Sequence, residues 1–276
     1  MSLLLALGVG TLIGLSLGAL GAGGSILAVP ALVYLLGQSP VQATSGSLVV
    51  VAVTSLIGAV ALHHAGKVML ARGIAFGLVA IGGAVVGARA SALVPEAVLV
   101  AAFSALMLFV GGLVVLRQIL HQGRTAHPGV HAARPVFDDP IIAVREGFLC
   151  DCPRAFKVLV TATTVGLLTG FLGVGGGFLV VPALVLALAL PIEFAAGTSL
   201  VAITITSTAA LAARVDVGVA PNWWLVTALT AASSVGGFAG ARAVAHVDSS
   251  KLSAAFAALV LAVAGWTAVS ALPAIT

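Results

Sequence analysis

The sequence predicts an all-α membrane protein, a polytopic helical bundle made of two tandem repeats that are inverted relative to each other. Of the 276 residues, 61% are hydrophobic and 7% are charged, against about 25% charged in an ordinary soluble domain. A surface facing water needs more charged groups than this, so most of the chain is expected in lipid. The alternation of apolar and polar residues that is typical of outer-membrane strands is missing, which disfavours a β-barrel.

Apolar runs between polar breaks define five segments in each half, and several approach the roughly 20 residues that a helix needs to cross the hydrocarbon. The first five are predicted near 2–20, 24–37, 43–62, 72–93 and 97–117. The second five are predicted near 158–172, 176–190, 196–213, 222–244 and 250–272. The second segment of each half is short and contains a proline, so it is expected to be a half-helix, a hairpin arm or a helix that barely spans.

These segments divide the chain into a first membrane repeat (1–117), a connector (118–157) and a second membrane repeat (158–276). If all ten segments cross, ten basic residues lie on the connector side and two on the other; if the short segments are re-entrant, the division is nine to three. Basic loops stay in the cytoplasm. Both counts therefore predict a cytoplasmic connector.

An internal duplication supports this division. GALGAGGSILAVPALV (18–33) aligns without gaps with GFLGVGGGFLVVPALV (170–185), and eleven of the sixteen positions are identical. The same offset continues further along the chain, and after a slip of one residue it pairs Arg89 with Arg242. Five crossings per half would invert the second half relative to the first, an arrangement that recurs in secondary transporters.

In each half a glycine run interrupts an apolar helix. Such a break frees backbone N–H groups that hydrocarbon cannot satisfy, and a helix N-terminus attracts anions. Inverted symmetry would bring the two breaks together at mid-depth, where they would hold a small anion. The predicted substrate-binding residues are Gly21, Gly23, Gly24 and Ser25 in the first half, and Gly173, Gly175, Gly176 and Gly177 in the second. The alternative is that these glycines only allow close helix packing.

Small hydroxyl residues open the third segment of each half and form a second candidate for substrate binding. They are Thr44, Ser45 and Ser47 in the first half, and Thr198 and Ser199 in the second. Their hydroxyls can donate hydrogen bonds to an oxyanion, or they can simply cap the helices.

A gating or coupling role is a weaker hypothesis for a few charged and titratable residues near helix ends. Arg89 and Arg242 could attract or gate an anion, although arginines at helix ends usually extend to the membrane interface. His63, His64 and Asp216 could take part in proton coupling, and interfacial placement is the alternative.

No catalytic residue, metal or cofactor is expected. The histidines and cysteines of the connector match no standard metal-binding spacing, and no nucleophile–base set or Walker loop is present. The expected partners are a small anionic substrate and the lipid bilayer, and not nucleic acid, because the net charge of +4 arises from loop residues that set orientation. A homo-oligomer is left open.

The duplicated stretches GAGGSILAVPAL and GVGGGFLVVPAL, the AGTSL at 196–200 and the two G-A-R helix ends resemble the TauE/SafE sulfite exporter family of membrane transporters. The resemblance covers both halves and omits the connector. It implies transport of a small sulfur-containing anion, such as sulfite or an organosulfonate, across the inner membrane of a prokaryote. The halves differ at the site, because Ser25 stands where the second half has Gly177.

The sequence therefore predicts a secondary transporter, an exporter that works by alternating access. An anion channel is the alternative, because the same electropositive helix ends could line a pore. A membrane-embedded enzyme or an assembly factor is less favoured, because the acidic and histidine residues lie near helix ends or in loops.

Overall fold

The computed structural model describes residues 2–20, 25–95, 98–106, 108, 109, 112, 152–187, 190, 192–214, 222–243 and 265, and the regular elements among these residues are all helical. In the first half they are α1 (Ser2–Leu20), α2 (Ser25–Pro30), the π-helix η1 (Ala31–Leu35), α3 (Pro40–His64) and α4 (Leu70–Ser91), followed by a helical stretch at 98–106. In the second half they are α6 (Cys152–Leu172), α7 (Gly177–Ala187), α8 (Ile192–Arg214) and α9 (Trp223–Ala243).

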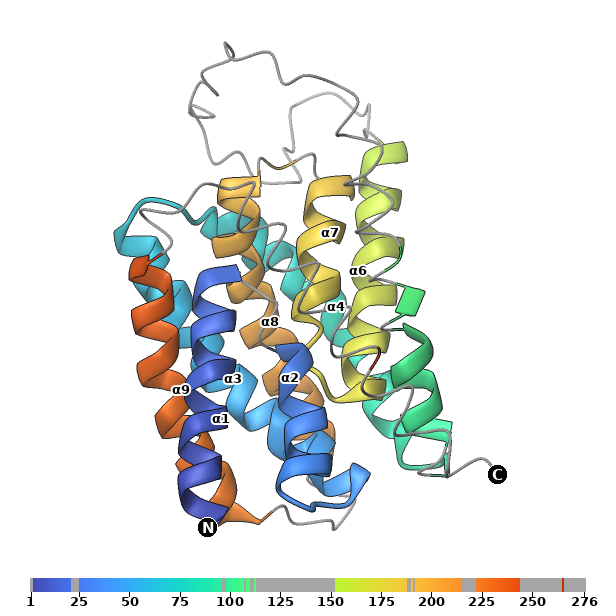
Figure 1. The fold of residues 1–276 in the computed structure, drawn as a ribbon. Helices are drawn as coiled ribbons and strands as arrows, with labels where there is room; N and C mark the ends of the chain where they lie inside the picture. Colours follow the sequence, from blue (N-terminus) through green and yellow to red (C-terminus); the bar gives the residue numbers. More distant parts are fainter. Residues whose placement is uncertain are drawn as a thin grey trace.

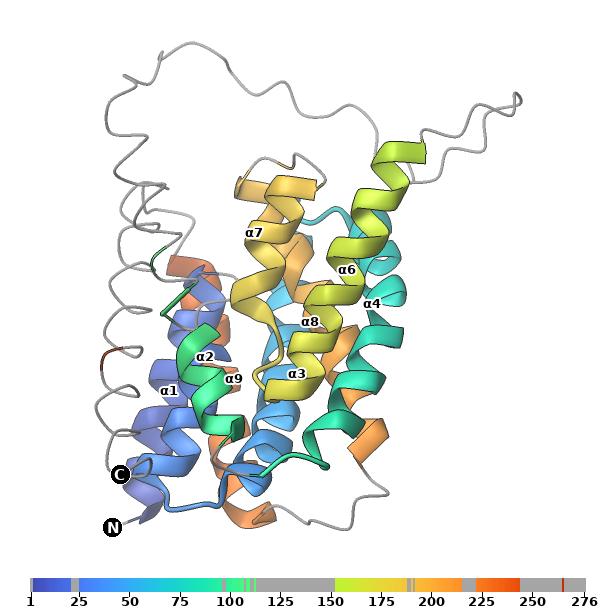
Figure 2. The same ribbon diagram turned by 90° about the vertical axis from the view of Figure 1, so that its right-hand side faces the viewer.

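The helices form one bundle and run roughly along a common axis (Figure 1). Helix α1 rises from the N-terminus at the lower end, whereas α6 begins at the upper end and descends. Helices α3 and α8 also run in opposite directions, with α3 beginning at the lower end (Figure 2). The short α2 occupies the lower half of the bundle and the short α7 the upper half. Helices α1 and α6, and likewise α3 and α8, thus point in opposite directions.

Three helical stretches in the described part of the chain are long and apolar enough to cross a membrane: Pro40–His64, Leu70–Ser91 and Phe194–Arg214. Shorter apolar stretches lie within α1 and α6. Many large apolar side chains point outward, as expected for a surface that faces lipid; Leu12, Val86, Leu93 and Val235 are among the most exposed. The prediction of an all-helical protein with several apolar membrane-spanning helices is confirmed. The predicted last segment, 250–272, lies outside the described residues except for Gly265.

Local sequence signals explain where the helices begin. Pro40 occupies the first position of α3, where a missing N–H costs nothing, and the Ser39 side chain accepts a hydrogen bond from the Gln42 N–H at 3.4 Å. Helix α6 begins at Cys152 rather than near the predicted residue 158. Pro153 suits the first turn of a helix, so the helix extends back into the predicted connector.

Helices α3 and α8 pack against each other in the middle of the bundle, and α1 packs on α9 while α4 packs on α6. Glycines make these two outer contacts very close. A Cβ on Gly14 would collide with the backbone of Ser233, and a Cβ on Gly166 would collide with the backbone of Ala80. Small residues that let backbones approach are the usual basis of helix association in lipid. Close packing is therefore the role of these glycines, which lie outside the two glycine breaks.

Candidate functional site

The glycine break between α6 and α7 is a tight turn buried in the bundle. Gly173, Gly175 and Gly176 have φ angles of +67°, +69° and +63°, a region that side-chain-bearing residues rarely adopt. The Gly173 N–H closes α6 on the Thr169 carbonyl at 3.0 Å, and the Gly176 carbonyl accepts from Leu179 and Val180 at the start of α7. The helix is interrupted at the predicted residues and restarts at Gly177.

This break packs against the third helix of the opposite half. The Cα of Thr44 would lie 2.8 Å from a Cβ on Gly173, and the Ser47 hydroxyl donates to the Gly173 carbonyl. Gly175 lies beside Ser207 of α8, whose Oγ would be 3.1 Å from a Cβ on the glycine. The structure thus brings together the predicted residues Thr44, Ser47, Gly173 and Gly175.

Two buried hydroxyls near the middle of α3 and α8 have no hydrogen-bond partner in the described part of the chain: Ser55 and Ser207. Both side chains are fully buried, and the alignment of the two halves pairs them. An unsatisfied buried hydroxyl costs about 1–3 kcal/mol. The neighbouring Thr54 contrasts with them, because its hydroxyl bonds to the Val50 carbonyl and to Ser233 Oγ at 2.8 Å. A polar solute beside Ser55 and Ser207 would remove that cost.

The first glycine break lies mostly beyond the described part of the chain. Gly21, Gly23 and Gly24 are outside the described residues, whereas Ser25 is the first residue of α2 and is fully buried. Helix α2 contacts α7. The expectation that the two breaks face each other therefore stays a prediction.

The hydroxyl residues of the second half are buried near the upper end of the bundle. The Thr198 hydroxyl accepts a hydrogen bond from the Met69 N–H at 3.1 Å, and Ser199 donates to the Ala196 carbonyl at 2.7 Å. Because α3 and α8 run in opposite directions (Figures 1 and 2), these residues lie towards the opposite end from Thr44. The two hydroxyl sets do not form a single cluster.

The residues predicted for gating or coupling lie at helix ends. Arg89 is exposed in the last turn of α4. Arg242 in the last turn of α9 lies 4.2 Å over the Phe238 ring. His63 and His64 end α3 and are exposed, with His64 Nδ1 2.8 Å from the Val60 carbonyl. Asp216 lies outside the described residues. Their gating role stays a prediction.

Arg214 is a polar residue of the site that the sequence interpretation missed. Its place directly after an apolar run suggests a loop residue, but it is the last residue of α8 and is only 8% exposed. Its guanidinium donates to Thr44 Oγ1 at 2.7 Å, Ser91 Oγ at 2.8 Å, and the carbonyls of Gly170 at 2.7 Å and Phe171 at 3.4 Å. Its Nε has no partner among the described residues. Its position at the end of an apolar run gave no signal of burial, because Arg89 ends an apolar helix in the same way and is exposed.

Arg214 lines a pocket of about 310 Å³, a volume that includes the open mouth. Its polar lining consists of Thr44, Ser45, Ser91 and Arg214, and its apolar lining of Val41, Ala88, Ala92 and Leu99. Arginine and hydroxyl donors in a largely apolar wall are suited to bind an oxyanion. No group of histidine, cysteine and acidic side chains in the described ranges could hold a metal ion.

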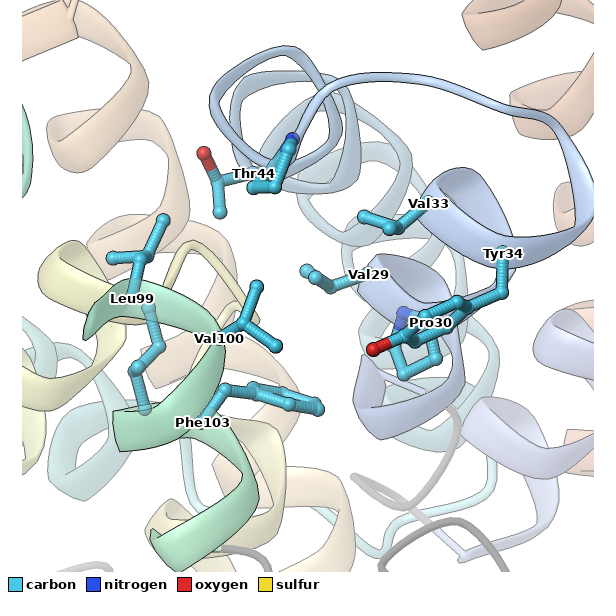
Figure 3. Close-up of a pocket in the computed structure, with 10 residues that line it drawn as sticks. Val29, Pro30, Val33, Tyr34, Thr44, Leu99, Val100 and Phe103 are labelled. Carbon is cyan, nitrogen blue, oxygen red and sulfur yellow. The ribbon is translucent and has the colours of Figure 1, made fainter. Parts of the chain in front are cut away.

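An apolar pocket of about 350 Å³ adjoins this one and shares Thr44 and Leu99 with it. Figure 3 shows Val29, Pro30 and Val33 on one side and Phe103 on the other. The Thr44 hydroxyl points away from these apolar side chains (Figure 3), in keeping with its bond to Arg214. Thr44 is therefore the boundary between an apolar and a polar pocket.

Comparisons with known proteins agree with these features. The family model described as sulfite exporter TauE/SafE matches residues 6–267. A probable membrane transporter protein of Xylella fastidiosa strain Temecula1 is 34% identical over 268 residues, which cover 95% of this chain and 94% of the relative. A protein of the same description from strain 9a5c is 35% identical over 203 residues, covering 73% and 70%. No solved structure matches.

The helical bundle and these matches define a multi-pass membrane transporter of a small substrate, and not an enzyme. The chain belongs to the sulfite exporter TauE/SafE family.

Proposed function

We propose that this transporter moves a small sulfur-containing anion, such as sulfite or an organosulfonate, out of the cell by alternating access. The observation that carries the proposal is the buried break at the N-terminus of α7, beside the unpaired hydroxyl of Ser207. The family description names a sulfite exporter, which supports a sulfur-containing anion as the substrate.

The backbone N–H groups at the break can bind an anion that has lost its hydration shell. The first N–H groups of a helix have no partner within the helix and carry roughly half a positive charge, and glycine lets a solute approach the backbone closely. The hydroxyl of Ser207 adds a donor from α8, and Ser55 offers an equivalent donor from α3. Because the surroundings are apolar, these dipoles act at low dielectric, where their attraction for a charge is strong.

The substrate-binding residues that we propose are those of the two glycine breaks and the hydroxyl residues that follow them, and the two hydroxyl sets would contact the anion at different points along its path. It comprises Gly21, Gly23, Gly24, Ser25, Thr44, Ser45, Ser47, Gly173, Gly175, Gly176, Gly177, Thr198 and Ser199. Contacts of Thr44, Ser47 and Gly173 with one another support the part at the second break.

Alternating access would follow from inverted repeats, 1–117 and 158–276, joined by a cytoplasmic connector at 118–157 in the inner membrane of a prokaryote. Reciprocal contacts support the repeats. The alignment of the two halves relates the Gly14–Ser233 contact to the Gly166–Ala80 contact, and α1 and α6 run in opposite directions (Figure 1). Inverted repeats commonly place the substrate at their interface near mid-membrane.

The membrane potential favours the proposed direction. An interior-negative potential drives an anion outward with about 2.3 kcal/mol per charge per 100 mV. Export of a monoanion therefore needs no coupling ion, whereas import would need one.

Flux of radiolabelled sulfite and methanesulfonate in proteoliposomes under an imposed potential tests this function. We expect saturable flux that is faster when the compartment holding the anion is made negative. Ser207→Ala should raise the KM about tenfold, because a hydrogen bond to a charged group contributes about 1.5–3 kcal/mol.

Thr208→Ala is the matched control, because Thr208 is the exposed neighbour of Ser207 on α8 and should leave the KM unchanged. No flux of either anion with the wild-type protein would refute the anion assignment. A rate that does not saturate would favour the channel alternative. An unchanged KM in Ser207→Ala would mean that the anion does not bind at the break beside Ser207.

A further inference from the structure

We propose that the pocket around Arg214 is a second anion site, at the end of the pathway where α3 begins and α8 ends. There the oxyanion group of the solute takes over hydrogen-bond donors of Arg214 that now serve Thr44 and Ser91. This proposal rests on the proposed function in one respect, namely that the solute is an anion.

The charge of Arg214 is buried without a carboxylate among its hydrogen-bond partners in the described residues. Those partners are two hydroxyls and two backbone carbonyls, all neutral. Ionisable groups buried in membrane proteins are costly, and they commonly mark substrate or ion pathways. The guanidinium has a planar fork of donors that matches the oxygens of an oxyanion, and its Nε has no acceptor within the described residues. The pocket therefore combines an available donor with a positive charge.

The pocket is connected to the central break through Thr44. This residue contacts Gly173 with its Cα and accepts a hydrogen bond from Arg214 with its hydroxyl. Ser207 and Arg214 lie on the same face of α8, two turns or about 10 Å apart. An exported anion that leaves Gly175 and Ser207 would thus pass Gly173 and Thr44 before it reached Arg214.

The site belongs to one end of the bundle only. The gap-free alignment of the two halves pairs Arg214 with Leu62 and Thr44 with Ala196, so the equivalent position at the opposite end has neither the charge nor the hydroxyl. At its own end, Arg214 joins α8 to α3, α4 and α6 through its hydrogen bonds. An anion that takes these donors competes with the bonds between the helices, so binding and opening of this end are linked.

Substitutions of Arg214 in the full-length protein test the proposal through two readouts. The first is the rise in thermal midpoint of detergent-solubilised protein on adding sulfite or methanesulfonate; the second is the KM for flux in proteoliposomes. In Arg214→Gln we expect the anion-dependent rise to disappear and the KM to increase about tenfold or more, as for a lost charged hydrogen bond. Arg214→Lys keeps the positive charge but not the planar fork of donors. Its KM and its anion-dependent rise in thermal midpoint should lie between those of the wild type and those of Arg214→Gln.

Lys157→Gln is the matched control, because it also removes one positive charge, from an exposed side chain of α6 that belongs to neither proposed site; both readouts should equal those of the wild type. Ser91→Ala covers the case in which Arg214→Gln fails to fold. It frees one guanidinium donor without removing the charge, so the KM should fall severalfold, which a purely structural role would not produce.

The outcomes separate this proposal from the proposed function. Flux with an unchanged KM in Arg214→Gln, or an unchanged KM in Ser91→Ala, would overturn the Arg214 site while the anion transporter stands. Stabilisation of the wild type by anions that is lost in Arg214→Gln, without any measurable flux, would support the site and reject transport of those anions.

Discussion

Replacing Gly176 by alanine is expected to remove most of the folded protein. Gly176 has a φ of +63°, where a side-chain-bearing residue costs about 1–2 kcal/mol. A Cβ there would also collide with the hydroxyl of Thr169, and overpacking of this kind costs about 1–3 kcal/mol more. These losses are a large part of the roughly 5–15 kcal/mol that stabilises a typical domain. The yield of monodisperse protein and the thermal midpoint in detergent measure the effect.

Two other glycines separate the causes. Gly37 has a φ of +64°, but a Cβ at this position would meet open space, so Gly37→Ala should show the cost of backbone strain alone. Gly82 in α4 has neither strain nor a close neighbour, and Gly82→Ala should leave stability unchanged or slightly higher because alanine favours helix. Equal midpoints for Gly176→Ala and Gly37→Ala would mean that the break is not tightly packed.

Gly14→Ala is expected to destabilise the contact between α1 and α9. A Cβ on Gly14 would overlap the backbone of Ser233, and a backbone cannot rotate aside as a side chain can, so the helices must separate. The expected loss is about 1–3 kcal/mol, seen as a lower thermal midpoint. Gly166→Ala should have a similar effect on the contact between α4 and α6, because it meets the backbone of Ala80 in the same way.

Gly8 provides the control for this second prediction, because it lies on α1 as Gly14 does and a Cβ there meets nothing within 4 Å. Gly8→Ala should therefore leave the midpoint unchanged. If Gly8→Ala and Gly14→Ala lowered the midpoint equally, close packing of α1 on α9 would not be the cause.

Features set by local sequence could be predicted, because composition, helix length and backbone freedom are local properties. The membrane class followed from the low charge, and the turn at Gly173 and Gly176 followed from a glycine run between two apolar helices. Glycine has two structural roles here, at different positions. Gly176 has a positive φ, whereas Gly14 allows two backbones to touch. The sequence could not assign these roles, because they depend on which helix lies opposite.

Arg214 shows what sequence reasoning could not reach. Arg89 and Arg214 both end an apolar helix, yet Arg89 is exposed and Arg214 is buried. The difference comes from α3, α4 and α6, which converge on Arg214 and supply its acceptors from distant parts of the chain. Ser91 carried no signal at all, since a lone serine at a helix end is common.

The glycine contacts that join α1 to α9 and α4 to α6 also restrict how the protein can move. Backbones in direct contact interlock, so one helix of a pair cannot slide or roll on the other without breaking the contact. Each pair is therefore expected to move as one rigid body. During a transport cycle the two pairs would rotate as whole units, and side chains would repack where the pairs contact α3 and α8.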